Sequence, residues 1–272
     1  MSDILAALAI PVIRHAFFGM LIAGATLSML GVVIVSLHLT AIRFTLMHIG
    51  LLGAAAGMSL GMSPAPGAFA LVLAASFVMG ITGKRFAISS SSVMGLFMTG
   101  SLAGAFLLLA VSGVPAMAVF SVFAGNILLM TRLDLLFVAV LGAAVAGVFL
   151  VAYREIELVL LDDELARALG VPVDLITSGL FVLVGAGVAA ALRLVGALLV
   201  DGIILLPGIA ALRFARGFGS ALILSVVFGV LTSVGGFFGA LVFDLPVGAS
   251  AAAASTLILA ASVLLSRLIY RS

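Results

Sequence analysis

Long runs of apolar residues dominate the chain, and each is about 17 to 25 residues long. As a helix, such a run crosses the ~30 Å hydrocarbon core of a bilayer. Strands of a membrane barrel would instead alternate apolar and polar residues over about 10 positions, and the sequence has no such alternation. The sequence therefore predicts an all-α, polytopic membrane bundle.

The composition excludes a soluble enzyme with an aqueous active site of its own. Hydrophobic residues make up 65% of the 272 residues and charged residues only 8%, whereas soluble domains carry about a quarter charged residues. So few charges cannot cover a water-exposed surface, so the lipid bilayer must be a large part of the solvent. The net charge of +2 is small and its cations are scattered, which argues against nucleic acid as a partner.

Nine apolar runs predict about 8–9 transmembrane helices in one permease domain over residues 1–272. Very short breaks, at Ser63–Pro64 and at Arg193, predict two close antiparallel hairpins. The stretch 114–130 is interrupted by glycine and proline and favours a re-entrant or interfacial segment. The predicted spans are 16–37, 46–62, 65–82, 92–112, 134–152, 173–192, 194–212, 218–242 and 247–268.

The distribution of lysine and arginine predicts the orientation, because cytoplasmic loops are enriched in these residues. With the N-terminus outside and the C-terminus inside, nine basic residues lie inside and three outside. We therefore expect a multi-pass protein of the cell (inner) membrane, N-out and C-in. The inside set is Arg43, Lys84, Arg85, Arg154, Arg167, Arg213, Arg216, Arg267 and Arg271, and the outside set is Arg14, Arg132 and Arg193.

One segment, 153–170, is too polar for the membrane. It holds seven of the 22 charged residues and falls on the cytoplasmic side of this topology. Asp162 or Asp163 can cap a helix by accepting the unpaired N–H groups of its first turn, and Gly170 with Pro172 can end it. The segment predicts a short amphipathic helix, either a solvated loop helix or a docking element for a cytoplasmic partner.

Four stretches, in order, resemble the zinc/manganese-type (ABC-3 family) permease subunits of ABC transporters. They are TLMHIGLLGAAAG at 45–57, DDELARALGV at 162–171, LVGALLVDGIILLPGIAALRFAR at 194–216 and FDLPVGAS at 243–250. The resemblance covers most of the chain from Arg43 onward. It implies that 153–170 is a cytoplasmic coupling helix, in which an acidic pair, an alanine and a glycine match the family. The candidate ATPase-coupling residues are Asp162, Asp163, Glu164, Ala166, Arg167 and Gly170.

The same resemblance implies a permease subunit that pairs with a second permease copy, most simply as a homodimer. A cytoplasmic ABC ATPase dimer would bind beneath it, and an extracytoplasmic metal-binding protein would deliver a divalent ion such as Zn, Mn or Fe. The chain has no GxxxxGK[ST] loop, so ATP chemistry must come from another chain. The metal is the substrate, and no permanently bound cofactor is expected.

His48 lies in the second predicted span, where an ionisable side chain is costly and suggests a function. By resemblance it is the histidine of the cation path, and a neutral imidazole nitrogen binds Zn, Mn, Fe or Ni. The alternative is a packed histidine that donates to a backbone carbonyl. Met47, Met58 and Met62 are on the same predicted span, with Met58 and Met62 sharing a face, and favour packing over soft-metal binding.

Asp201 lies inside the seventh predicted span. Gly202 and Pro207 should loosen that helix and free carbonyl groups that could also coordinate a cation. A metal ligand and an ion pair with Arg193 are equally plausible interpretations of Asp201 from the sequence.

The sequence departs from the family pattern just before His48. A Gly-Asp pair usually precedes this histidine, but here the positions hold Arg43 and Phe44, so a carboxylate–histidine pair is missing. Asp201 could compensate, although a depth difference of about 12 Å favours two sequential stations over one shared site.

Three alternatives to a bare-cation importer remain open from the sequence. One is a permease for a metal chelate such as a siderophore or cobalamin. Another is an ATP-independent secondary transporter that uses Asp201 as a proton or sodium relay. The third is a membrane scaffold that transports nothing.

Overall fold

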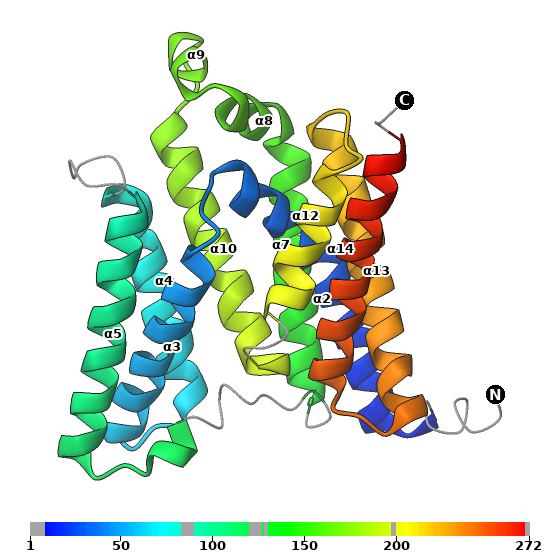
Figure 1. Ribbon diagram of the computed structural model, residues 1–272. Helices are drawn as coiled ribbons and strands as arrows, with labels where there is room; N and C mark the ends of the chain where they lie inside the picture. Colours follow the sequence, from blue (N-terminus) through cyan, green and yellow to red (C-terminus); the bar gives the residue numbers. More distant parts are fainter. Residues whose placement is uncertain (1–8, 83–89, 120–126, 128–129, 197–199, 270–272) are drawn as a thin grey trace. The chain divides into compact units, whose positions relative to one another are not determined.

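The computed structural model describes residues 9–82, 90–119, 127, 130–196 and 200–269. All regular secondary structure in these ranges is helical, and eight of their helices are long and apolar enough to cross a membrane. This confirms the predicted all-α membrane bundle. The eight are α2 (Pro11–Ser36), α3 (Ile42–Ser59), α4 (Pro64–Thr82), α5 (Ser90–Ser112), α7 (Arg132–Val151), α10 (Val173–Val195), α13 (Phe218–Phe243) and α14 (Val247–Ile269) (Figure 1).

Contacts within the chain group these helices into two compact units. Unit 1 comprises residues 1–35, 126–147 and 194–272, and unit 2 comprises residues 36–125 and 148–193. Each unit is thus assembled from segments that are distant in sequence. The single permease domain over residues 1–272 and the N-out, C-in orientation stay predictions.

In unit 1, α2 packs against α13 through small residues. A β-carbon built on Gly229 of α13 would lie 2.8 Å from the β-carbon of Ser28 and would also collide with the carbonyl oxygen of Gly24. One helical turn along α13, the Ser233 hydroxyl donates a hydrogen bond to the Met20 carbonyl oxygen at 2.9 Å. Close backbone approach and interhelical hydrogen bonds replace the hydrophobic effect as the attraction between helices in lipid.

In unit 2, α3 and α4 form the close antiparallel hairpin predicted at Ser63–Pro64. A β-carbon on Gly67 of α4 would lie 3.0 Å from the Cα of Gly57 and would collide with the carbonyl oxygen of Gly53. The two helices therefore touch backbone to backbone. Near the start of α3, the Thr45 hydroxyl donates to the Met94 carbonyl oxygen of α5 at 3.1 Å, which links α3 to α5.

Helix α10 joins the same unit by packing on α4. A β-carbon on Gly80 would lie 2.8 Å from the Cα of Ser178, and one on Gly185 would lie 2.7 Å from the β-carbon of Ser76. Two glycine contacts along one helix pair hold α10 and α4 in a fixed register. Unit 2 is thus a packed set in which α10, α4, α3 and α5 follow one another through direct contacts.

The prediction that residues 194–212 form one separate membrane-spanning helix is wrong. Helix α10 continues through Arg193 to Val195, so the tight hairpin predicted at Arg193 is wrong too. The chain leaves α10 at Gly196, whose φ of 87° lies in the left-handed region that glycine tolerates. Helical structure resumes as a π-helix, η2 (Asp201–Leu205), followed by α12 (Leu206–Leu212).

The physical reason for the π-helix is Pro207. Proline lacks the N–H that would bond to the carbonyl four residues earlier, and its ring clashes with that carbonyl in an α-helix. In η2 the Leu206 N–H instead donates to the Asp201 carbonyl, five residues back. The helical segment Asp201–Leu212 is also shorter than each of the eight long helices.

The predicted re-entrant segment 114–130 lies largely outside the described residues, which include only 114–119, 127 and 130 of it. Its interpretation as a re-entrant or interfacial segment stays a prediction.

Candidate functional site

The residues singled out from the sequence fall in different units. His48 and all of 153–170 belong to unit 2, whereas Asp201 belongs to unit 1. Each is therefore described within its own unit. The proposed depth difference between His48 and Asp201, the compensation of Phe44 by Asp201 and the ion pair of Asp201 with Arg193 stay predictions.

His48 is partly buried on α3, one turn after Phe44. Its Nδ1 lies 2.6 Å from the Phe44 carbonyl oxygen. A carbonyl can only accept, so Nδ1 carries a proton, and in the neutral imidazole Nε2 keeps its lone pair. This is the arrangement of a packed histidine, and it is also the arrangement of most metal-ligating histidines, whose other ring N–H is held by a carbonyl or carboxylate.

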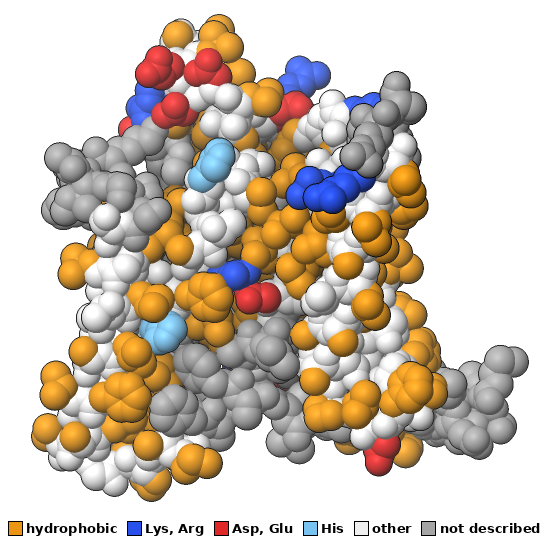
Figure 2. Space-filling view, in the orientation of Figure 1, with side chains coloured by type: hydrophobic (Ala, Val, Ile, Leu, Met, Phe, Trp, Pro, Cys, Tyr) orange, Lys and Arg blue, Asp and Glu red, His pale blue; other side chains and the backbone are white. Residues whose placement is uncertain are grey.

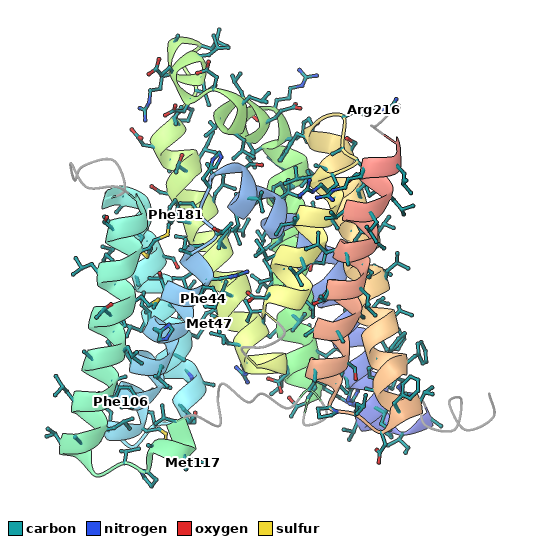
Figure 3. All side chains as sticks on the ribbon, viewed as in Figure 1. Phe44, Met47, Phe106, Met117, Phe181 and Arg216 are labelled. Carbon is teal, nitrogen blue, oxygen red and sulfur yellow. The ribbon has the colours of Figure 1, made fainter. Side chains whose placement is uncertain are left out.

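Arg43 and Phe44 occupy the two positions where the family resemblance leads one to expect glycine and aspartate. The guanidinium carbon of Arg43 lies 4.5 Å from the centre of the Phe44 ring, a cation–π contact. Phe44 lies on α3 about one turn before Met47, and Figure 3 labels both residues. On this helix, a backbone carbonyl therefore orients His48 where a carboxylate was expected.

The three methionines of the predicted second span have different surroundings. Met47 is buried, and Met58 packs against a cluster that includes Leu51 and Ala55, which confirms packing for these two. Met62 lies beyond the end of α3, past Gly61 with its φ of 73°, and is exposed. The prediction that Met58 and Met62 share a helical face is therefore wrong, because the helix ends at Ser59.

Asp201 is the first residue of the π-helix η2 in unit 1 and is partly buried. The next four residues are buried, and a β-carbon on Gly31 of α2 would lie 2.9 Å from the carbonyl carbon of Ile204. Helix α2 thus contacts the backbone of this segment at Ile204. Single π-turns are frequent at functional sites, and the departure from α geometry predicted at Gly202 and Pro207 is confirmed.

In the part of the chain that the structure describes, no three or more His, Cys, Asp and Glu side chains come together in a group that could hold a metal ion. Within those described residues, neither His48 nor Asp201 is thus part of a preassembled group of metal ligands. A transported ion needs weak, successive sites rather than a permanent one. His15 is partly buried near the start of α2, and His38 is exposed between α2 and α3.

The polar segment 153–170 forms two short helices and not one. They are α8 (Tyr153–Leu161) and α9 (Asp163–Ala168), and the chain is extended between them at Asp162 (Figure 1). The Asp162 carboxylate accepts hydrogen bonds from the Glu164 and Leu165 N–H groups, both at 3.0 Å. Of the two predicted caps, Asp162 is the one used, and capping forces its backbone out of helical geometry.

The end of α9 is a Schellman turn, the common glycine-closed helix terminus. Gly170 has a φ of 82°, its N–H donates to the Arg167 carbonyl, and the Val171 N–H donates to the Ala166 carbonyl. The predicted termination at Gly170 is thereby confirmed. A side chain on Gly170 would strain the left-handed backbone that the turn requires.

Two sets of contacts tie α9 to its neighbours. The side chains of Val159 in α8, Ala166 in α9 and Val173 in α10 are buried together. Arg167 forms a two-point ion pair with Asp174, in the first turn of α10. The sequence analysis missed Asp174, although an arginine and an aspartate seven residues apart across a glycine–proline turn were a signal that could have identified it.

The exposed surface of α9 and its two flanking residues, 162–169, carries acidic side chains and leucines. Glu164 and Asp162 are exposed, Leu165 is 49% exposed, and Leu169 is 64% exposed. Figure 2 shows acidic side chains gathered over the region of α9.

Comparison with known proteins agrees with this fold. The permease protein ScaB of a manganese import system in Streptococcus gordonii is 25% identical over 246 residues, 90% of this chain and 88% of that protein. MntC, a manganese transport system membrane protein of Halalkalibacterium halodurans, is 24% identical over 238 residues, 88% of this chain and 82% of that protein.

A solved structure, PsaBC from Streptococcus pneumoniae in complex with Fab, superposes with a TM-score of 0.81. It is 24% identical in sequence, and the match covers 96% of this chain and 94% of that one. This likeness shows the fold alone. The decisive comparison is with family models: residues 9–266 match the ABC 3 transport family, and the chain belongs to that family as a membrane-spanning, non-enzymatic permease subunit of an ABC transporter.

Proposed function

We propose that this chain forms the membrane pathway of an ATP-driven importer of a divalent first-row metal ion. Two relatives are named for manganese transport, which makes Mn²⁺ the first candidate. The observation in this chain that supports a metal substrate is His48, whose Nδ1 is engaged at 2.6 Å while Nε2 remains available as a ligand.

The partners follow from the division of labour in an ABC transporter. A second permease copy would complete the pathway, most simply in a homodimer. An ABC ATPase dimer would bind at α8 and α9, and an extracytoplasmic metal-binding protein would deliver the ion. The capped, glycine-closed helix α9 supports the docking role, because only a rigid contact transmits motion from one subunit to the next.

Zn²⁺ is the competing substrate, and the chemistry of α3 makes the comparison informative. Mn²⁺ prefers carboxylate and water oxygens, whereas imidazole suits Zn²⁺ well. The position one turn before His48 holds Phe44, so α3 offers no carboxylate there. Selectivity for Mn²⁺ would therefore require oxygen ligands from elsewhere, with Asp201 as the proposed second station.

The test is uptake of radioactive Mn²⁺ and Zn²⁺ into proteoliposomes that hold this chain, its ABC ATPase and its binding protein. We expect uptake of the metal to require both ATP and the ATPase. We also expect that an excess of one of the two metals, added unlabelled, inhibits this uptake. Uptake by the chain alone without ATP would instead establish a secondary transporter. Uptake only of a siderophore or cobalamin complex would establish a chelate permease.

A further inference from the structure

Arg167 and Asp174 join α9 to α10 through two parallel hydrogen bonds. Nη1 of Arg167 donates to Oδ2 of Asp174 at 3.0 Å, and Nη2 donates to Oδ1 at 2.5 Å. The two side chains are 41% and 71% exposed. Exposed ion pairs usually contribute little, but a two-point arginine–carboxylate pair also fixes the relative orientation of the groups that it joins.

The guanidinium of Arg167 stays charged over the working range of pH. The hydrogen bond to Asp174 favours the charged guanidinium and raises the pKa of Arg167, and the negative charges of Asp174 and Asp163 add to this effect. A raised pKa means that Arg167 keeps the proton it donates as the pH rises, and loses it only above that already very high value.

The ion pair acts together with two other constraints on α9. The Schellman turn at Gly170 sets the angle between α9 and α10, and the buried side chains of Val159, Ala166 and Val173 fill the space between the helices. The turn and the buried cluster join α9 to α10 on the buried side of α9. Arg167 and Asp174 join α9 to α10 on the exposed side of the turn.

We propose that Asp174 is a positioning residue of the transport cycle: by holding Arg167, it keeps α9 rigid on α10. This inference rests on the proposed docking role of α8 and α9. Arg167 then acts as a brace within the chain and is not a contact to the ATPase. The surface left for the ATPase is the one that carries Glu164, Leu165 and Leu169.

A displacement of α9 can travel from α10 through unit 2 to His48. Helix α10 meets α4 at Gly80 and Gly185, and α4 meets α3 at Gly67. All of these contacts involve backbone or short side chains, which deform little. A brace at the first step consequently decides how much of the movement reaches the helix that carries His48.

The experiment is a double-mutant cycle in the assembled transporter. Asp174→Ala, Arg167→Ala, the double alanine variant and the charge swap Arg167→Asp with Asp174→Arg are compared for metal transported per ATP hydrolysed and for retention of the ATPase on purification. Arg267→Ala is the control, because Arg267 is an exposed arginine in the last turn of α14, outside α8 and α9. The melting temperature of each complex shows whether it is folded.

We expect each single alanine variant to lower transport per ATP by about three- to fivefold, with the ATPase retained. The double alanine variant should be no worse than either single one, the swap should recover at least about half of the lost transport, and Arg267→Ala should match the wild type. Loss of the ATPase in Arg167→Ala alone, with normal coupling in Asp174→Ala, would overturn the brace in favour of a direct contact.

The two proposals fail in different ways. If the wild-type complex moves neither Mn²⁺ nor Zn²⁺, the proposed cargo is wrong, and the cycle is then measured on the ATP hydrolysis rate of the complex. If the wild type transports and Asp174→Ala transports equally well per ATP, the cargo stands and the brace is refuted.

Discussion

The Nδ1 atom of His48 lies 2.6 Å from the carbonyl oxygen of Phe44, one turn earlier on α3. The contact fixes the ring and its tautomer without using a second side chain. It also explains why a histidine can keep its orientation here although no aspartate precedes it. Because the backbone supplies the acceptor, substitution of Phe44 should leave this contact in place, whereas substitution of His48 removes the ligand itself.

Replacement of His48 tests the metal pathway. We expect His48→Ala to lower the rate of ATP-dependent metal uptake by about tenfold or more, with the complex still isolable, because the only imidazole on α3 is lost. Uptake in proteoliposomes measures this, and His38→Asn serves as the control, since His38 is exposed with a φ of 55° that asparagine tolerates. Unchanged uptake kinetics in His48→Ala would return this residue to a packing role.

Neutralising Asp201 separates its two interpretations. Asp201→Asn keeps the size of the side chain and removes the charge. For a cation station on the pathway we expect a higher KM for the metal with an unchanged melting temperature in detergent. A lower melting temperature with an unchanged KM would instead identify an ion pair between helices.

Loss of the cap on α9 should weaken coupling. Asp162→Ala removes the acceptor for two N–H groups, which costs about 1 kcal/mol of helix stability. We expect less metal transported per ATP and faster amide hydrogen exchange in residues 163–168. Asp162→Asn can still accept these bonds and should behave like the wild type, whereas equal loss in both variants would point to a role for the charge itself.

Two glycines on α13 provide a matched test of packing in unit 1. Gly229→Ala should destabilise the protein by about 1–3 kcal/mol, because its β-carbon would lie 2.8 Å from that of Ser28 and would collide with the Gly24 backbone. Gly239→Ala adds the same methyl group to the same helix, where nothing lies within 4 Å. Thermal unfolding in detergent should show a lower melting temperature for the first variant only.

The helical spans were predictable from the sequence because length and hydropathy alone set them. The α3–α4 hairpin followed from the two-residue break at Ser63–Pro64, and Asp162 with Gly170 marked the ends of α9 through their chemistry. The seventh span failed because an apolar run does not reveal hydrogen-bond register. Pro207 shifts that register to a π-turn, and Gly196 places the bend after Arg193 instead of at it.

Side-chain partners were harder to predict than helices. The ion pair of Arg167 with Asp174 depends on the angle that the Schellman turn gives to two helices, and composition carries no information on that angle. In the same way, the carbonyl partner of His48 belongs to the backbone of Phe44 and is invisible in a side-chain pattern.

The contact of Gly53 and Gly57 with Gly67 has a mechanical consequence. With no side chains between the two helices, there is no soft layer to absorb a small slide or tilt. The α3–α4 hairpin should therefore move as one rigid body, so that even a shift of α4 too small to repack a side chain also displaces α3.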